Sequence, residues 1–140
     1  MNYKLEELID IILSKSEQLE DELKTQSDLR DLTIKQLLCI QLIEKFHNPT
    51  LTELSKKLKI TKPSVTAIIE KLEYKGYIKK VKSDTDRRSA HVHLTNKGEK
   101  AGRLHTEVHN QFAKLLTQNL VNSEKEILIV LLNKAVNSLQ

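Results

Sequence analysis

The hydrophobic period of the chain changes after Gly76, and this change limits the folds that the chain can adopt. Before Gly76 and after Thr95, apolar residues recur every three or four positions, as on one face of an α-helix. Between these points, residues 77–83 and 90–94 have the pattern of two short strands. The charged segment 84–89, DTDRRS, separates them, so we predict a two-stranded hairpin in an otherwise helical chain.

Helix-start signals divide the rest of the chain. A Ser or Thr followed three residues later by Glu or Gln is a capping box, which satisfies two backbone N–H groups at a helix start. A Pro in the first turn is also favourable, because its missing N–H has no helical partner there. The signals are Thr33 with Gln36, Thr50 with Glu53, Thr61 with Pro63, Thr95, and Ser123 with Glu126. The predicted helices cover residues 3–24, 33–47, 50–58, 61–75, 95–116 and 123–139.

Two short helices joined by a tight turn and followed by a hairpin make a winged helix-turn-helix. The predicted fold class is therefore mainly α with a small β-hairpin. We expect a single domain, residues 1–140, with the winged helix-turn-helix core at about 33–95. The long helices at about 3–24 and 96–139 are not needed by that core, and their apolar stripes require a partner.

Positive charge is concentrated in the middle of the chain. Residues 1–54 hold six Lys/Arg and eleven Asp/Glu, a net charge of −5. Residues 55–103 hold fourteen and five, a net charge of +9, and residues 104–140 hold three of each. Such a basic segment is typical of a surface that binds phosphates, although a solvated face would give the same run.

Several classes of protein are disfavoured by what the sequence lacks. The single Cys39 excludes an intramolecular disulfide, and no apolar run approaches the roughly 18 residues of a membrane span. The first residues carry acids where a secretory signal carries bases, so we expect a cytoplasmic protein. A Gly-rich phosphate loop, a nucleophile elbow and a zinc-hydrolase signature are all missing. We therefore expect neither an enzyme nor a cofactor.

The central sequence resembles the DNA-binding core of the MarR family of bacterial transcriptional regulators. The similar region is LTELSKKLKITKPSVTAIIEKLEYKGYIKKVKSDTDRRSAHVHLTNKGEK, residues 51–100. Its helix-turn-helix, LEYKGYI, DTDRR and LTNKG stand in the family's order and spacing, and the length of the chain also fits. One departure is Lys59, where the family commonly has glycine, so the lysine adopts a positive φ or the turn differs.

This resemblance implies a sequence-specific DNA-binding regulator, expected to be a repressor, that binds a pseudo-palindromic operator as a homodimer. The terminal helices would pair with those of a second subunit and place two reading heads about 34–36 Å apart. The family also implies an affinity modulated by a ligand between the dimer helices and the reading head. Segments RLHTEVH, YKGYIKKV and DRRSAHVHLT look most like members that repress fatty-acid synthesis genes, which would allow an acyl-bearing effector. The alternatives are a non-sequence-specific architectural DNA-binding protein and a winged helix that binds only protein.

Candidate DNA contacts fall on the helix 61–75. Its side chains that lie off the apolar stripe would face base edges in the major groove. Hydroxyls can donate or accept hydrogen bonds there, and a methyl group can touch a thymine methyl. An ordinary solvent-exposed face would have the same composition. The candidates are Thr61, Lys62, Ser64, Thr66 and Ala67.

The hairpin supplies the other candidate DNA contacts. A thin β-ribbon tip can reach the minor groove, where the enhanced negative potential suits arginine. The resemblance places Arg88 there, with Asp86 holding its guanidinium and Arg87 on a phosphate. Lys80 and Lys82 are further phosphate-binding candidates, as is Lys79, although side chains alternate along a strand. A surface ion pair of little consequence is the alternative interpretation of the tip.

Three other residues raise the question of a metal or redox site. His105 and His109 are four apart on a predicted helix, a spacing that can chelate. Other ligands are needed, and the Glu-His pair that the resemblance leads us to expect reads Gln36-Leu37. We therefore predict structural histidines and no metal. Cys39 lies between apolar residues, which favours a buried, inert thiol over a redox switch.

Overall fold

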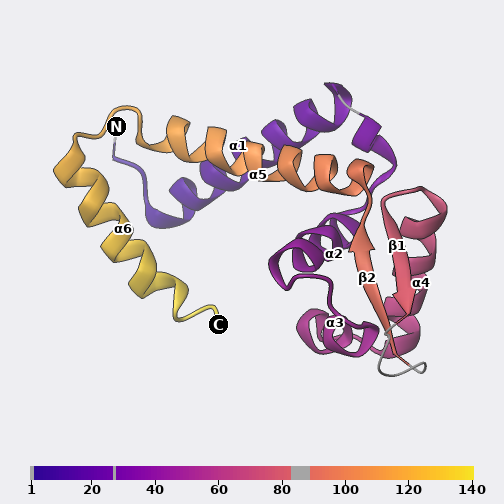
Figure 1. Ribbon diagram of the computed structural model, residues 1–140. Helices are drawn as coiled ribbons and strands as arrows, with labels where there is room; N and C mark the ends of the chain where they lie inside the picture. Colours follow the sequence, from indigo (N-terminus) through magenta and orange to yellow (C-terminus); the bar gives the residue numbers. More distant parts are fainter. Residues whose placement is uncertain (1, 27, 83–88) are drawn as a thin grey trace.

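The computed structural model describes residues 2–26, 28–82 and 89–140, which form a helical protein with one antiparallel hairpin (Figure 1). This architecture confirms the predicted fold class. In the described part of the chain, none of the helices combines the length and the hydropathy that a membrane span needs. The elements are α1 (Leu5–Gln26), the 3-10 helix η1 (Asp28–Asp31), α2 (Ile34–Lys45), α3 (Leu51–Leu58), α4 (Lys62–Tyr74), β1 (Ile78–Lys82), β2 (Ala90–Leu94), α5 (Asn96–Thr117) and α6 (Asn122–Val136).

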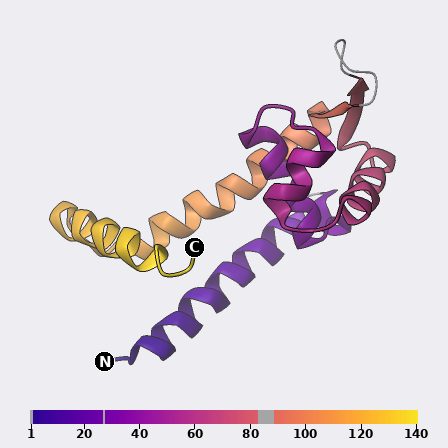
Figure 2. The same cartoon turned by 90° about the horizontal axis from the view of Figure 1, so that it is seen from below.

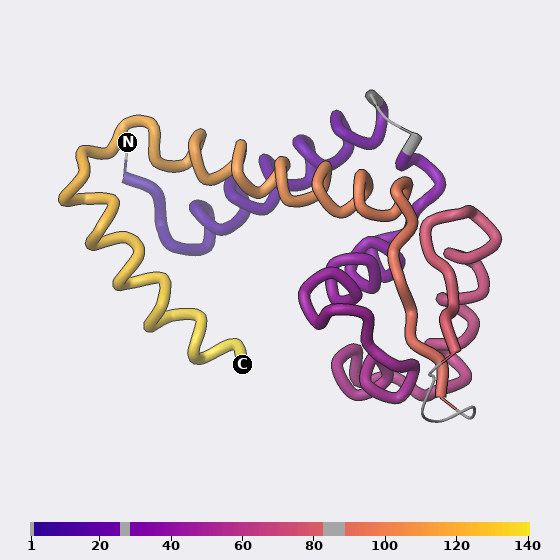
Figure 3. The backbone as a smooth tube through the Cα atoms, viewed as in Figure 1, coloured from indigo at the N-terminus to yellow at the C-terminus, as the bar shows by residue number. Residues whose placement is uncertain are grey.

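The chain forms a head and an arm, which the backbone trace separates clearly (Figure 3). We call residues 33–95 the head and α1, α5 and α6 the arm. The head encloses the core between α2, α3, α4 and the hairpin, and the start of α5 closes it. Its side chains with 0% exposure are Cys39, Ile40, Leu54, Val65, Ile69, Leu72 and Val92.

Three of the predicted capping interactions fix the starts of the head helices. In α2, the Gln36 N–H donates to Thr33 Oγ1 at 3.2 Å and the Thr33 N–H donates to Gln36 Oε1 at 3.0 Å. Thr50 and Glu53 form the same reciprocal pair at α3, at 3.2 and 2.8 Å. Thr61 caps α4, as predicted. In each of these helices, a threonine hydroxyl therefore accepts from one of the first N–H groups, which have no partner within the helix.

The predicted start of the last helix is wrong. Helix α6 begins at Asn122, so Ser123 lies inside its first turn and does not cap it. The residue before the helix is Val121, whose N–H donates to Glu124 Oε2 at 2.9 Å. Glu124 thus supplies the acidic half of a capping box, and it shifts the helix start ahead of the Ser123–Glu126 pair.

The turn between α3 and α4 uses a left-handed residue. Lys59 has φ 54° and ψ 40°, so of the two alternatives for this position the positive φ holds. The turn is closed by two hydrogen bonds: the Ile60 N–H donates to the Ser55 carbonyl at 3.3 Å, and Ser55 Oγ donates to the Ile60 carbonyl at 2.7 Å. These hydrogen bonds on either side of Lys59 hold the lysine in its strained left-handed conformation.

The hairpin is tied to the head through β2. Ile78 pairs with Leu94, and Lys82 pairs with Ala90. On its other edge, the Val92 N–H donates to the Pro49 carbonyl at 2.9 Å, next to an isolated bridge between Thr50 and His91. The first strand, predicted at 77–83, is β1 and covers Ile78–Lys82 among the described residues. The start of α3 and the hairpin are thus fixed against each other.

The arm extends away from the head. Helices α1 and α5 lie antiparallel along each other, and α6 turns off at the far end (Figure 2). Within the described residues, α6 has no buried side chain and no extensive contact with another element. Its large apolar side chains are exposed: Ile127 59%, Ile129 58%, Val130 55%, Leu131 57% and Leu132 47%.

Candidate nucleic-acid interface

The first two turns of α4 present a polar face to solvent. Val65 and Ile69 are fully buried on the core side of the helix. The candidate residues lie on the other sides: Thr61, Lys62, Ser64 and Ala67 are exposed, and Thr66 is half-buried. The predicted division of this helix into a core face and a solvent face is therefore present.

Two hydroxyl groups are fixed at the N-terminus of α4. Thr61 Oγ1 accepts from the Ser64 N–H at 3.3 Å and lies 2.9 Å from Ser64 Oγ, with either hydroxyl able to donate. The helix N-terminus also carries partial positive charge, which attracts anions. An exposed, positively polarised helix end with ordered hydroxyls and Lys62 beside it is well suited to a phosphate backbone.

The lysines of β1 point to opposite faces of the hairpin. Ile78 is buried and residues 79–82 are exposed, so by alternation Lys80 and Lys82 share the face of Ile78. Lys80 Nζ lies 4.0 Å from Glu73 Oε1, and the Lys80 N–H donates to Glu73 Oε2 at 3.3 Å. A phosphate contact by Lys80 would therefore compete with its ion pair on α4.

Lys79 lies on the opposite face of the hairpin, in a polar cavity of about 280 Å³. Glu44 and Glu99 also line this cavity, so Lys79 faces two carboxylates of α2 and α5. The remaining lining residues are Ile43, His47, Asn48, His93 and Leu94.

The hairpin tip lies outside the described residues. It contains Asp86, Arg87 and Arg88, whose roles therefore stay predictions. The base of the hairpin is described, and there Lys82 pairs directly with Ala90. This pair places the two chain ends of the tip beside each other, on the end of the sheet away from α5 (Figure 1).

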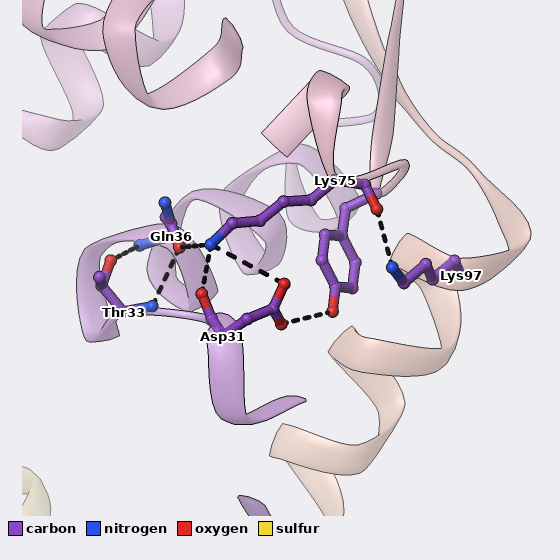
Figure 4. A network of polar contacts seen from close by, with 6 residues as sticks. Asp31, Thr33, Gln36, Lys75 and Lys97 are labelled. Atoms are coloured by element: carbon purple, nitrogen blue, oxygen red, sulfur yellow. Dashed lines mark hydrogen bonds and ion pairs between the residues drawn. The ribbon is translucent and has the colours of Figure 1, made fainter. Parts of the chain in front are cut away.

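A polar network holds the C-terminal end of α4 to the segment between α1 and α2 (Figure 4). Lys75 Nζ donates to the Asp31 carbonyl and, at 3.4 Å, to Gln36 Oε1. Tyr77 Oη donates to Asp31 Oδ1 at 3.1 Å. Lys97 Nζ donates to the Lys75 carbonyl at 2.7 Å and lies 4.3 Å from the centre of the Tyr77 ring. The orientation of α4 is therefore coupled to the start of α2 and the start of α5.

The network was not predicted from the sequence. Asp31 and Lys75 are 44 residues apart, and both are of ordinary types for a solvated surface. The one local signal is Gln36, whose sequence position predicts only its part in the α2 capping box. In the structure its side chain also accepts from Lys75, so a single amide connects the helix start to the end of α4.

Cys39 is buried, as predicted. It has 0% exposure, and burial raises the pKa of its thiol to about 12. The thiol is therefore protonated at neutral pH, and reactivity requires the thiolate.

His105 and His109 lie beside Glu20 of α1. Their rings stack edge to face with centres 4.6 Å apart. One ligand atom from each of the three residues lies within 4.8 Å of the others. Burial, and next the neighbouring His109, lowers the pKa of His105. Sequence reasoning missed Glu20, because only the packing of α1 on α5 brings it to the histidines.

The region that matches a known protein family coincides with the head. Residues 32–90 match the profile of the MarR family. PapX of Escherichia coli, an HTH-type transcriptional regulator, is 33% identical over 102 residues, which are 73% of this chain and 62% of PapX. YkoM of Bacillus subtilis, an uncharacterized HTH-type transcriptional regulator, is 32% identical over 85 residues, 61% of this chain and 55% of YkoM. The chain thus spans less than two thirds of the length of these relatives.

Comparisons with solved structures extend over nearly the whole chain. FabT of Streptococcus pneumoniae in complex with DNA is 31% identical, with a TM-score of 0.78 and coverage of 96% of both chains. Wild-type MarR from Escherichia coli is 26% identical, with a TM-score of 0.66 and coverage of 96% of this chain and 98% of that one. The similarity therefore includes the arm as well as the head.

Proposed function

The chain belongs to the MarR family, and we propose that it is a sequence-specific DNA-binding transcriptional regulator that represses its target genes as a homodimer in the cytoplasm. The observation that carries this proposal is the exposed polar start of α4 beside a basic hairpin. The likeness over 96% of the chain to a FabT solved with DNA supports it.

In the proposed complex, α4 enters the major groove. Ser64 and Thr66 would read base edges by hydrogen bonds, and Ala67 would touch a thymine methyl. Thr61 and Lys62 lie at the helix start. In the complex, their nearest partners would be phosphates. This division assigns sequence discrimination to the first two turns of α4.

The hairpin would follow the neighbouring minor groove. Arg88, held by Asp86, would enter the groove, and Arg87 and Lys82 would contact phosphates. Lys80 would join them only after exchanging Glu73 for a phosphate, so we expect a small net gain from it.

The exposed apolar face of the arm supports the proposed homodimer. An amphipathic helix with its apolar side in water needs a partner, and a second copy supplies the same face by two-fold symmetry. The two heads would then lie about one DNA turn, ~34–36 Å, apart, which requires a pseudo-palindromic operator.

We also propose that an apolar or acyl-bearing effector modulates the affinity for DNA. The crevice between α1, α2 and α5 has a volume of about 10 Å³, room for roughly one water molecule. An effector would therefore bind by separating these helices or by using the partner subunit's surface. It would act through different affinities for the DNA-competent and incompetent dimers, with a coupling of ~1–3 kcal/mol.

The proposed function is tested by selecting bound DNA from a random pool. The selected duplex and a scrambled duplex of the same composition are then compared by fluorescence anisotropy at several salt concentrations. A specific regulator gives an affinity ratio of ~10³–10⁷. A ratio near one with strong salt dependence indicates an architectural DNA-binding protein, and the absence of salt-dependent binding indicates a winged helix that binds only protein.

A further inference from the structure

Asp31 connects the segment after α1 to the C-terminal end of α4. It is the last residue of η1, the short helix that follows α1 and precedes α2. Its carboxylate accepts from Tyr77 Oη at 3.1 Å and lies 3.9 Å from Lys75 Nζ, and its backbone carbonyl accepts from the same ammonium (Figure 4). One residue therefore holds both neighbours of Gly76.

The segment that Asp31 holds is the point where the chain turns from α4 into β1. Gly76 has a φ of 84°, a left-handed conformation in which glycine has more freedom than other residues. The start of α5 restrains this segment on one side: Thr95 Oγ1 donates to the Gly76 carbonyl at 2.6 Å, and Lys97 Nζ donates to the Lys75 carbonyl at 2.7 Å. Asp31 restrains it from the side of α1 and α2. The orientation of α4 therefore depends on both sets of contacts.

We propose that Asp31 is a positioning residue for DNA recognition, which acts through Lys75 and Tyr77 on the orientation of α4. This inference rests on the proposed function, because it requires an operator that α4 reads. Asp31 and Tyr77 lie at the opposite end of α4 from Thr61 and Ser64, and Tyr77 is only 1% exposed. Their effect on DNA binding would therefore pass through the fold and not through a contact with DNA.

A displaced α4 should affect operator and random DNA differently. A hydrogen bond to a base edge needs a donor–acceptor distance of ~2.7–3.2 Å, so a displacement of about 1 Å at Ser64 removes it. Lysine is a point charge on a flexible stem, so Lys62 can still reach a phosphate after the same displacement. Random DNA is bound mainly through its phosphates. The loss should therefore fall on the ratio of operator affinity to random-DNA affinity.

The charge of Asp31 separates a positioning role from a purely electrostatic one. Removing an acidic side chain from a DNA-binding head reduces repulsion by the phosphates, so charge alone predicts tighter binding to any duplex. A positioning role predicts weaker binding to the operator. Replacing Tyr77 by Phe removes a hydroxyl and leaves the net charge unchanged, so this variant isolates the positional effect.

The test compares Asp31→Ala and Tyr77→Phe with the parent chain by fluorescence anisotropy on the selected operator and its scrambled duplex. We expect Asp31→Ala to lower the affinity ratio about tenfold and Tyr77→Phe to lower it less. The double variant should be no worse than Asp31→Ala, because the hydroxyl acts through Asp31. Partial unfolding would lower both affinities alike, so the ratio measures positioning and not stability.

Glu99→Ala is the matched control. Glu99 is an exposed acid that pairs with Arg103 of the same helix at 4.0 Å, so its removal changes the charge equally without releasing α4. Its affinity ratio should equal that of the parent chain. A parent ratio near one would overturn the proposed function and this inference with it. If the parent chain discriminates and both test variants discriminate equally well, or if Asp31→Ala binds both duplexes more tightly, only the positioning role of Asp31 is overturned.

Discussion

The head and the arm use the same kinds of apolar residue in opposite ways. In the head, Leu54 and Ile69 have 0% exposure, because α2, α3, α4 and the hairpin enclose them. In the arm, Ile127 and Leu131 are 59% and 57% exposed, although they follow the same helical period. The head therefore encloses its core within one chain, whereas the arm leaves an apolar surface exposed, which supports the proposed homodimer.

This contrast teaches that hydrophobic period alone does not distinguish a core within one chain from an interface between two. The period identifies the face of a helix that avoids water. Whether that face packs against its own chain depends on the direction in which each connection sends the next helix. The turns of the head fold α2, α3 and α4 onto one another, whereas the equally short turn after α5 sends α6 away from α1 (Figure 1).

The largest effect is expected for Leu54→Ala in the head. The substitution leaves a cavity among fully enclosed side chains, and such changes cost ~2–5 kcal/mol of the free energy of unfolding. Urea unfolding followed by far-UV circular dichroism measures it. The control is Ile34→Ala, because Ile34 is 72% exposed and its loss should cost less than ~0.5 kcal/mol. Equal costs for the two variants would mean that the head is not a self-contained core.

In the arm, Ile127→Asp combined with Leu131→Asp should separate the subunits. The two residues lie on one side of α6, and buried charges at an interface are costly. We expect the dimer dissociation constant to rise at least ~100-fold, about 2.7 kcal/mol, as measured by analytical ultracentrifugation.

The matched control adds the same two charges on the other side of α6, as Asn122→Asp with Asn133→Asp. It should leave the dimer intact. A parent chain that sediments as a folded monomer at micromolar concentration would contradict the proposed role of the arm.

Arg88→Ala should weaken binding to the selected operator by ~1–3 kcal/mol without changing the free energy of unfolding. Asp86→Ala should have a smaller effect, because it only loosens Arg88. Lys80→Ala serves as the contrast: it should weaken selected and scrambled DNA alike and lower the salt slope by ~1 if Lys80 meets a phosphate. If the Arg88→Ala protein binds the operator as tightly as the parent chain, the hairpin tip is not part of the DNA interface.

The smallest effect is a gain of stability. Lys59→Gly removes the cost of a left-handed lysine, so the free energy of unfolding should rise by ~0.5–1 kcal/mol. Lys59→Ala keeps a Cβ atom and should bring no such gain. Thermal unfolding of the two variants side by side measures the difference. A destabilised glycine variant would show that the lysine side chain itself holds the turn.

Local chemistry determined which features could be predicted from the sequence. The Thr33, Thr50 and Thr61 caps were predicted because each involves residues only three apart. The start of α6 was not predicted, because two acidic residues are placed to form a capping box there. Glu126 lies three residues after Ser123, and Glu124 lies three residues after Val121. The structure uses Glu124. The buried and exposed faces of α4 follow from its period.

Contacts between distant segments could not be predicted in this way. The Asp31–Lys75 pair and the placement of Glu20 beside His105 depend on how the helices pack, and charged residues of these types are common on any surface. Because no third ligand is apparent from the sequence alone, the two histidines were predicted to be structural.

The unbroken length of α5 makes it a lever. Its 22 residues form a rod of about 33 Å, which begins directly after β2 of the head and ends just before α6. A tilt of about 5° at one end of such a rod moves the other end by about 3 Å. In a two-fold dimer both heads would move, so their separation would change by up to about 6 Å while the groove spacing of DNA stays fixed. Small angular changes in the arm would therefore be converted into a large mismatch at the operator.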